Sequence, residues 1–490
     1  MIKSHILSPG LYVHVPFCLS KCAYCDFYSL TDHALIPDWL AALEKEAFLY
    51  QDRFGVFDTL YLGGGTPSLL DTGRFAVLMQ SLRRHFSFSR DIEVTLEANP
   101  DDLTSEKIKL YKDLGVNRLS LGVQSFDDRE LSFLGRRHNT RQTLEALEAL
   151  RNAGFANLSL DLIYGLPGQS LADWRQTLEQ ALAFAPEHLS CYQLTYEPGT
   201  PLGRKSARGE VIPATEEEER DSFLFTSHFL ETRGYFHYEI SNFARLREPE
   251  NETIYHINLD ADRNLIHSIP PPHGGRGLGG GDSSVASLPH KAQFLANEEC
   301  STGLTDNQES SNRKPKTENR KRYYYSRHNR KYWRHAPYLG LGPGAHSFQD
   351  GRRWWNIPSV GQYCQALAQG RAPVAQREVL SPPQLRLEAL YLGLRTKDGV
   401  PLDLLRQTPG WRQILKALQK AGLIEVIRDR AIPTRRGFLL ADSLPLRFMD
   451  GGLGNKDMDY PRGKAGTPGP WPLTPAPCRN ALQDDNRRGT

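Results

Sequence analysis

Between residue 11 and about residue 200, short apolar runs alternate with longer segments of helical periodicity. The apolar runs are rich in β-branched and aromatic residues and predict strands at Leu11–Val15, Thr59–Leu62, Ile92–Leu96, Arg118–Val123, Leu158–Ile163 and Leu189–Leu194. The longer segments predict helices at Pro37–Tyr50, Gly73–His85, Ser105–Leu114, Thr140–Ala153 and Leu171–Ala185. Strands that alternate with helices predict βαβ units around a parallel sheet. Six such units favour an α/β fold of the partial, TIM-like (β/α)6 barrel type over a closed eight-fold barrel.

The pattern changes after a further predicted helix at Ala214–Arg233. Residues 246–325 are rich in Gly, Pro, Ser, Asn and charge, which predicts a disordered insertion because such a segment buries little apolar surface. The core, residues 1–245, is therefore expected to resume over residues 326–380.

A small C-terminal domain is predicted over residues 381–445. Leu385–Leu394 and Trp411–Ala421 have helical patterns, and Leu423–Val426 with Ala431–Thr434 predict a hairpin, which together resemble a helical, winged-helix-like unit. Residues 446–490 are again rich in Gly and Pro and are predicted to form a disordered tail.

Composition narrows the class of protein. A net charge of +3 over 490 residues is small and gives no reason to expect a nucleic-acid partner or a charged membrane surface. No run of 18 apolar residues predicts a transmembrane helix, and no apolar segment follows the N-terminus as in a signal peptide. We therefore expect a cytoplasmic protein.

Three of the seven cysteines, Cys18, Cys22 and Cys25, lie within eight residues, directly after the first predicted strand. An odd number of cysteines in a chain without a signal peptide argues against a disulfide framework. Three thiolates on one loop can ligate three irons of a 4Fe–4S cube and leave the fourth iron open to a small ligand.

Two other readings of these cysteines remain open. A zinc site would need a fourth ligand, for which His14 is the nearest histidine. A redox pair of the thioredoxin type would use Cys22 and Cys25 and would not need Cys18.

A CxxxCxxC motif after a first strand is typical of the radical S-adenosylmethionine (SAM) superfamily, and further motifs extend the resemblance. They are Tyr12–Cys18 (YVHVPFC), Gly63–Pro67 (GGGTP), Glu97–Pro100 (EANP), Gly122–Phe126 (GVQSF), Asp161–Gly168 (DLIYGLPG) and Gly340–Ser347 (GLGPGAHS). Together they resemble the coproporphyrinogen dehydrogenase-like, or HemN-like, family. The match covers about residues 10–245 and 326–445.

The resemblance implies a 4Fe–4S cluster on the three cysteines and bound SAM. The residues that match the family's SAM contacts are Tyr12, Tyr24, Gly64, Gly65, Thr66, Glu97, Gln124, Arg136 and Asp161. Arg136 is preferred to Arg137 by its spacing from Gln124. An electron donor such as flavodoxin or ferredoxin is a further possible partner.

Two features resemble the HemW branch of this family. Phe27 stands where the dehydrogenase carries a fourth cysteine, and His328–Trp333 reads HNRKYW, which matches the branch's HNxxYW string. This branch is regarded as haem chaperones, which implies haem, an acceptor protein for it, and His328 as an axial ligand. His335 and His346 are competing histidines.

Two alternative functions remain. One is an enzyme that oxidatively decarboxylates coproporphyrinogen III by radical chemistry. The other is a scaffold that carries a cluster without catalysis.

Overall fold

The computed structural model describes residues 7–247 and 323–449. The strands are β1 Gly10–Val15, β2 Phe57–Gly64, β3 Phe88–Ala98, β4 Arg118–Gln124, β5 Leu158–Tyr164, β6 His188–Gln193, β7 Tyr235–His237, β8 Asn242–Arg245, β9 Tyr338–Leu341, β10 His346–Gln349, β11 Arg352–Asn356, β12 Val374–Val379, β13 Val400–Pro401, β14 Ile424–Ile427 and β15 Arg430–Pro433. The α-helices are α1 Ile36–Tyr50, α2 Thr72–His85, α3 Ser105–Asp113, α4 Asp128–Leu134, α5 Thr140–Asn152, α6 Leu171–Ala183, α7 Pro201–Ala207, α8 Glu216–Glu231, α9 Asn329–Trp333, α10 Val360–Ala368, α11 Pro382–Gly393, α12 Leu402–Leu405, α13 Trp411–Lys420 and α14 Arg435–Leu439.

A twelve-stranded sheet organises the core in the order β12-β11-β10-β9-β1-β2-β3-β4-β5-β6-β8-β7. From β9 through β6 neighbouring strands are parallel, whereas the outer pairs are antiparallel. The predicted α/β fold with six parallel strands is confirmed. Among the described residues, β12 and β7 are the edge strands, and no hydrogen bonds between them close the sheet. The sequence did not predict α4, α7 or the added strands β7–β12.

Local sequence explains where the helices begin and end. Capping boxes begin α5 at Asn139, α6 at Ser170 and α8 at Thr215. Helix α6 stops at Ala183, before the predicted end at Ala185, because Ala185 adopts a positive φ of 45° that no helix can continue through.

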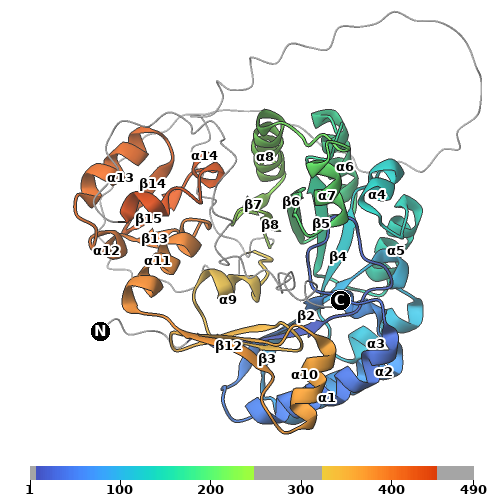
Figure 1. Cartoon of the computed structure of the whole chain (residues 1–490). Helices are drawn as coiled ribbons and strands as arrows, with labels where there is room; N and C mark the ends of the chain where they lie inside the picture. The colour runs from blue at the N-terminus through green and yellow to red at the C-terminus, as the bar shows by residue number, and fades with distance from the viewer. Residues whose placement is uncertain (1–6, 248–322, 450–490) are drawn as a thin grey trace, which may run out of the picture. The chain divides into compact units, whose positions relative to one another are not determined.

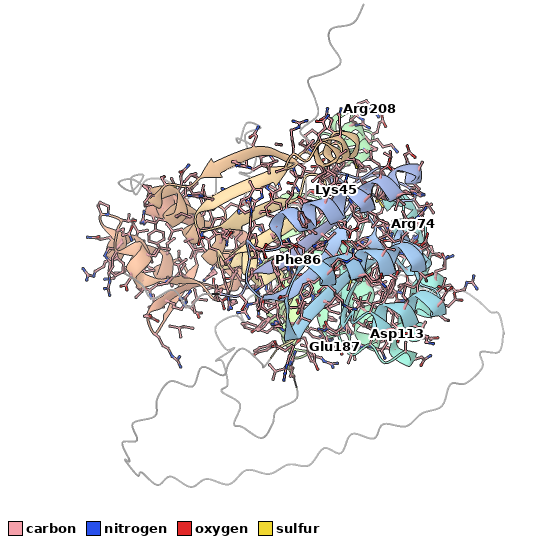
Figure 2. All side chains as sticks on the ribbon, turned by 90° about the horizontal axis from the view of Figure 1, so that it is seen from below. Lys45, Arg74, Phe86, Asp113, Glu187 and Arg208 are labelled. Carbon is pink, nitrogen blue, oxygen red and sulfur yellow. The ribbon has the colours of Figure 1, made fainter. Side chains whose placement is uncertain are left out.

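Helices cover the outer face of the sheet (Figure 1). Helix α1 packs against α2, and α2 packs against α3. Figure 2 shows Lys45 on α1, Arg74 on α2 and Asp113 on α3 following one another across this layer. Trp39 and Trp174 are fully buried between helix and sheet. This packing fixes the strands whose carboxyl ends carry the candidate site.

The C-terminal domain has its own core. Leu390, Leu405, Leu418 and Phe448 pack together around the small sheet β13-β15-β14. The predicted helices and hairpin are present. The fold extends to Met449, beyond the expected limit at residue 445, because Phe448 is buried in this core.

The described residues also extend into the ends of the predicted insertion. Leu246 and Tyr323 form an antiparallel bridge, and the Tyr324 N–H donates to the Arg245 carbonyl (3.1 Å). Residues 248–322 lie outside the described residues, as do residues 1–6 and 450–490. In the part of the chain that the structure describes, no helix is long and apolar enough to cross a membrane.

Candidate cofactor site and the HN segment

The three clustered cysteines lie on the loop that follows β1, and each of them is partly exposed. The Cys25 N–H donates to the Cys22 carbonyl (3.3 Å), which tightens the loop. The His33 imidazole contacts the Cys18 carbonyl (3.1 Å) and holds the loop to the segment before α1. Burial raises the pKa of the Cys25 thiol to about 12, so a cationic metal group is needed to hold this residue as a thiolate at neutral pH.

Two donors from outside the loop approach these sulfurs. The Thr66 hydroxyl lies 3.4 Å from Cys18 Sγ, and Arg136 Nη1 lies 3.4 Å from Cys22 Sγ. Donors at this distance stabilise thiolates and tune the electronics of a cluster bound to them. The cysteine loop is therefore surrounded by groups that suit a cluster of sulfur-ligated iron.

The geometry of His14 bears on the zinc reading. This histidine is fully buried in β1, with Nδ1 3.1 Å from the Tyr12 hydroxyl and Nε2 3.0 Å from the Tyr28 carbonyl. Burial lowers its pKa to about 4. Among residues 7–247 and 323–449, no group of three or more His, Cys, Asp or Glu side chains could hold a metal ion on its own. A 4Fe–4S cube does not need three ligands to converge on a single ion, because each thiolate ligates a different iron of the cube.

Glu97 lies at the carboxyl end of β3, beside the glycine-rich loop. Its Oε1 accepts from the Tyr61 hydroxyl (2.8 Å), and its Oε2 accepts from the Gly64 N–H (3.1 Å). Desolvation raises its pKa to about 7, although the residue keeps some exposure. Gly64 has a φ of 111°, and a Cβ there would lie 2.4 Å from the His14 ring, so only glycine fits.

The glycine-rich loop is held against the cysteine loop by main-chain bonds. The Gly65 N–H donates to Val15 O (2.8 Å), and the Thr66 N–H donates to Phe17 O (2.7 Å). These bonds place the Thr66 hydroxyl beside Cys18.

Gln124, Arg136 and Asn99 converge on Gly122. A Cβ at Gly122 would lie 3.0 Å from Gln124 Nε2, 3.1 Å from Arg136 Nη2 and 3.4 Å from Asn99 Oδ1. Arg136 donates to Asn99 Oδ1 (2.5 Å) and to the Gly122 carbonyl (2.9 Å), and it is hydrogen-bonded to Tyr24. Its neighbour Arg137 points elsewhere and pairs with aspartates after β3. Of the two arginines, Arg136 is therefore the one beside the cysteines.

Asp161 on β5 is the second carboxylate of this region. Both of its oxygens accept from the Ser120 hydroxyl (3.2 Å each), and Ser190 is a further partner. Burial raises its pKa to about 6. The sequence analysis assigned no site role to Asn99, Ser120 or Ser190. Of these three, only Asn99 could have been identified as a site residue from the sequence, because it follows Glu97 by two residues at a strand end.

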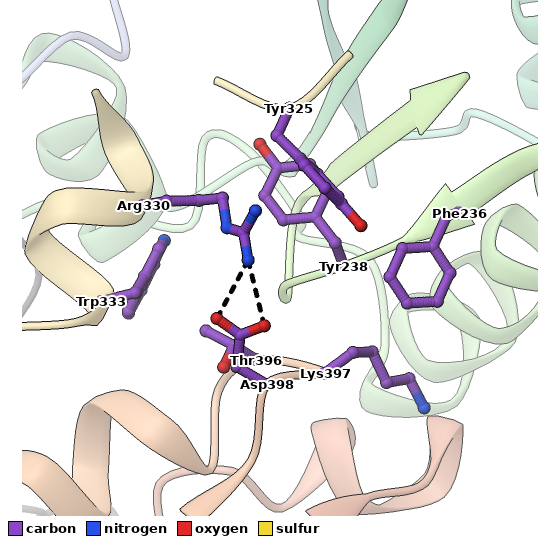
Figure 3. Close-up of a pocket in the computed structure, with 8 residues that line it drawn as sticks. All are labelled: Phe236, Tyr238, Tyr325, Arg330, Trp333, Thr396, Lys397 and Asp398. Carbon is purple, nitrogen blue, oxygen red and sulfur yellow. Dashed lines mark hydrogen bonds and ion pairs between the residues drawn. The ribbon is translucent and has the colours of Figure 1, made fainter. Parts of the chain in front are cut away.

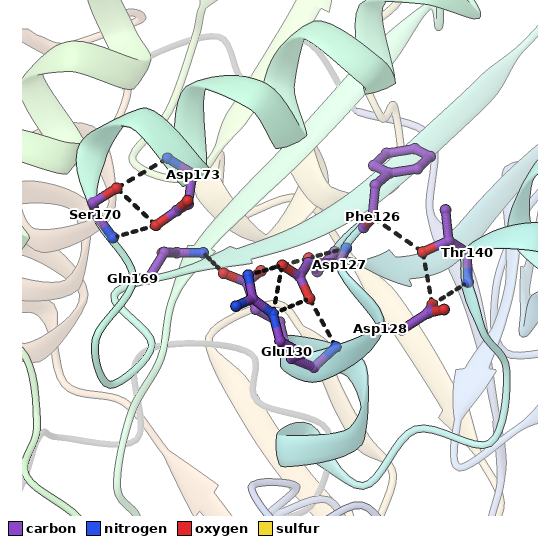
Figure 4. A network of polar contacts seen from close by, with 10 residues as sticks. Phe126, Asp127, Asp128, Glu130, Thr140, Gln169, Ser170 and Asp173 are labelled. Atoms are coloured by element: carbon purple, nitrogen blue, oxygen red, sulfur yellow. Dashed lines mark hydrogen bonds and ion pairs between the residues drawn. The ribbon is translucent and has the colours of Figure 1, made fainter. Parts of the chain in front are cut away.

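A polar network ties together the loops after β4 and β5 (Figure 4). Glu130 on α4 accepts from Ser125 and from Gln169 Nε2, and Gln169 Oε1 accepts from the Gly165 N–H (2.9 Å). Gln124, just before this network, has a φ of 67°, unusual for a residue with a side chain. The network stabilises the turn that places the Gln124 side-chain amide beside Gly122.

The HN segment, His328–Trp333, lies elsewhere. His328 is 1% exposed, with Nδ1 2.9 Å from Thr59 Oγ1 and Nε2 2.9 Å from the Tyr332 hydroxyl. Its main-chain N–H donates to Glu93 Oε1 (3.1 Å). Burial lowers its pKa to about 3, so its imidazole is neutral. Both ring nitrogens already have partners.

Tyr12 connects the two regions. Its ring lies 6.1 Å from that of Tyr61 and 6.3 Å from that of His328. The competing histidines lie apart from each other: His335 contacts Glu388 (3.1 Å), and His346 stacks on Trp355 with ring centres 5.5 Å apart.

Comparisons with known proteins identify the family and the fold. Residues 12–181 match the model of the radical SAM superfamily, and residues 380–440 match the HemN C-terminal domain. The radical SAM family implies a 4Fe–4S cluster and SAM. Coproporphyrinogen III oxidase (HemN) from Escherichia coli has a similar structure, with a TM-score of 0.64, 20% identity and 90% coverage of both chains, which shows the fold.

Curated relatives cover nearly the whole chain. Heme chaperone HemW from Mycobacterium tuberculosis is 32% identical over 89% of this chain and 93% of its own length. Heme chaperone HemW from Bacillus subtilis is 30% identical over 88% and 97%. A mitochondrial radical SAM domain-containing protein 1 from Danio rerio is 27% identical over 90% and 87%. Because the similarity runs through the radical SAM core and the HemN C-terminal domain together, this chain belongs to the HemW family of radical SAM proteins.

Proposed function

We propose that this protein is a haem chaperone: it binds haem, carries a 4Fe–4S cluster with SAM, and transfers haem to an acceptor protein. The observation that carries the proposal is its similarity, over about nine-tenths of the chain, to relatives named heme chaperone. We place its action in the cytoplasm.

Phe27 supports a chaperone over an enzyme. It occupies the position of the fourth cysteine of the dehydrogenase motif and is 40% exposed on the cysteine loop. A phenyl ring can neither ligate a metal nor carry an electron-rich sulfur, so whatever the fourth thiol supplies in the dehydrogenase is missing here.

Cys18, Cys22 and Cys25 would hold the cluster, and the residues around Gly64 and Gly122 would hold SAM. When bound, this pair supplies an iron open to the methionine moiety. Glu97 would accept hydrogen bonds from ribose hydroxyls, Asp161 would lie across from it, and Arg136 and Gln124 would bind the carboxylate. The Gly64–Gly65–Thr66 main chain would contact the amino group, with Tyr12 and Tyr24 flanking the cofactor.

Electrons for the cluster would enter through the exposed side of the cysteine loop. Leu19 and Phe27 of this loop are 52% and 40% exposed, and Lys21 is exposed as well. Exposed apolar side chains together with a cationic residue suit transient contact with an acidic electron donor of the flavodoxin or ferredoxin type.

We propose His328 as the axial haem ligand. A neutral imidazole is a common ligand of haem iron. Because both nitrogens are hydrogen-bonded, iron would have to replace one partner. We assign that role to Tyr332, because it lies on the five-residue helix α9, whereas Thr59 lies in strand β2 of the sheet. His335 and His346 are the alternatives that a variant series would separate.

The test is an anaerobic assay of the reconstituted protein with coproporphyrinogen III and haem in parallel. We expect stoichiometric haem binding, transfer of haem to an apo-acceptor, and no multiple-turnover formation of protoporphyrinogen IX. Multiple turnovers without haem binding would instead establish the dehydrogenase.

A further inference from the structure

A small pocket lies on the other side of the HN segment from His328. The pocket is lined by residues from three parts of the chain (Figure 3). They are Phe236 and Tyr238 at β7, Tyr325 before the HN segment with Arg330 and Trp333 within it, and Thr396–Asp398 after α11. The Lys397 N–H donates to the Tyr238 carbonyl (2.9 Å), so the C-terminal domain forms part of the wall.

The walls of the pocket are aromatic. The ring of Tyr325 lies 4.8 Å from that of Tyr238 and 6.4 Å from that of Phe236, both edge to face. The Arg330 guanidinium lies 4.2 Å over the Tyr325 ring. Rings held in this way present flat apolar surface to a planar ligand and an adjacent cation to its anionic edge.

Positive charge is in excess at this pocket. Arg330 donates to both oxygens of Asp398 (3.0 and 3.1 Å), and Arg334 donates to the same carboxylate through Nε (2.7 Å). Arg430 donates to the Asp398 and Gly399 carbonyl oxygens. Two guanidinium groups thus contact one carboxylate, and a third binds only main-chain oxygens beside it. The ammonium of Lys397 points away, to the Pro433 carbonyl (2.8 Å), and adds nothing to this count.

The HN segment therefore has two faces. His328 and Tyr332, four residues apart, lie on one face and contact each other at the barrel interior. Arg330 and Trp333, three residues apart, lie on the other face and line the pocket. Histidine and tryptophan of the same motif thus point to different sites.

We propose that this pocket binds the carboxylate-bearing edge of a porphyrin, with Arg330 as the partner of a propionate and Trp333 and Tyr325 against the ring. The inference rests on the proposed haem binding and adds a site to it. The enclosed space is about 10 Å³, room for about one water molecule, so a propionate oxygen would enter it and the ring would lie against the rim.

The test measures binding of haem and of haem dimethyl ester by Soret titration to wild-type, Arg330→Gln and Arg327→Gln proteins. Arg327 is the matched control, because it directly precedes the HN segment but pairs with Asp58, away from the pocket (3.3 Å). We expect Arg330→Gln to weaken haem binding by about tenfold, since it removes a charge-assisted contact, and to leave ester binding unchanged. Arg327→Gln should change neither.

A second variant tests the aromatic contact with the porphyrin ring separately from the charge of Arg330. Trp333→Leu should weaken haem and its ester alike, by several-fold, with an unchanged melting temperature. Haem binding of wild-type strength in both pocket variants would overturn this inference and leave the proposed function standing. Equal losses for haem and ester in Arg330→Gln would also overturn it. Wild-type protein that binds no haem would instead end the proposed function, and the pocket proposal with it.

Discussion

The cysteine side of the sheet and His328 of the HN segment differ in how far their side chains are exposed. Glu97, Asp161 and Arg136 keep part of their surface exposed at the carboxyl ends of the strands, and the three cysteines do as well. His328 is 1% exposed and bonded at both ring nitrogens. Both regions carry motif residues, yet Glu97, Asp161 and Arg136 present free surface to a ligand and His328 does not.

This difference in exposure implies two kinds of ligand binding at motif residues. At the strand ends a ligand would add contacts to those already present, because main-chain and side-chain groups there are partly exposed on the same side of the sheet. At His328 a ligand must replace a contact, so its affinity is reduced by the free energy of the bond that breaks, about 1 kcal/mol for a typical hydrogen bond. The predictions below test this contrast.

The largest effect is expected at the cysteine loop. Cys22→Ala should lower the iron content of reconstituted protein from about four atoms per chain to almost none, since a cube with two protein ligands is not retained. Iron analysis and the broad cluster absorbance measure this. Cys364→Ala is the control, because that half-buried thiol lies on α10. Full iron content in Cys22→Ala would refute the ligand assignment.

The next effect concerns SAM. Glu97→Gln should weaken SAM binding about 10–100-fold and leave iron content unchanged, because a hydrogen bond to a charged group contributes about 1.5–3 kcal/mol. Equilibrium dialysis of labelled SAM measures the affinity. Glu145→Gln serves as a matched control, since this exposed carboxylate lies on α5 and pairs with Arg141.

The same carboxylate predicts a pH dependence. The pKa of Glu97 is raised to about 7, so its better-accepting ionised form is populated only above that pH. Wild-type affinity for SAM should rise between pH 6 and pH 8. Glu97→Gln should be nearly flat over this range, apart from a smaller change at the lower end from Asp161, whose pKa is about 6. Identical profiles for the two proteins would show that Glu97 does not contact SAM.

A smaller effect, in the opposite direction, is expected at the HN segment. Tyr332→Phe frees His328 Nε2, so haem affinity should rise about fivefold, the factor that corresponds to one hydrogen bond of about 1 kcal/mol. His328→Ala should lose the wild-type Soret band. Tyr338→Phe is the control, because its ring packs on Tyr332 without touching the imidazole bond. If Tyr332→Phe binds no better and His328→Ala keeps the spectrum, then His328 is a structural residue and another histidine ligates haem.

The parts of the fold that the sequence predicted are those with a local signal. Strands β1–β6 and helices such as α5 and α6 follow from periodicity and capping, and the three cysteines follow from spacing. The convergence of Asn99, Gln124 and Arg136 does not, because it depends on how the segments after β3 and α4 fold back over the end of β4 at Gly122. The burial of His328 was equally hidden, since its partner Thr59 lies 269 residues away.

The smallest effect is expected from residues 248–322. Their replacement by Gly-Gly should leave iron content, haem affinity and melting temperature close to wild type. The Leu246–Tyr323 bridge already brings the ends together, and Arg247 with two glycines makes a three-residue hairpin loop of a common length. Closing a shorter loop also costs less entropy.

A longer deletion joins Arg245 to Ser326, the boundary that composition alone suggests, and it removes Tyr325 from the aromatic wall beside Tyr238. That longer deletion should keep the cluster but bind haem several-fold more weakly. If the shorter deletion lost haem binding to the same degree, then residues 248–322 would themselves contribute to the haem site, and the contrast between the two regions would have to include them.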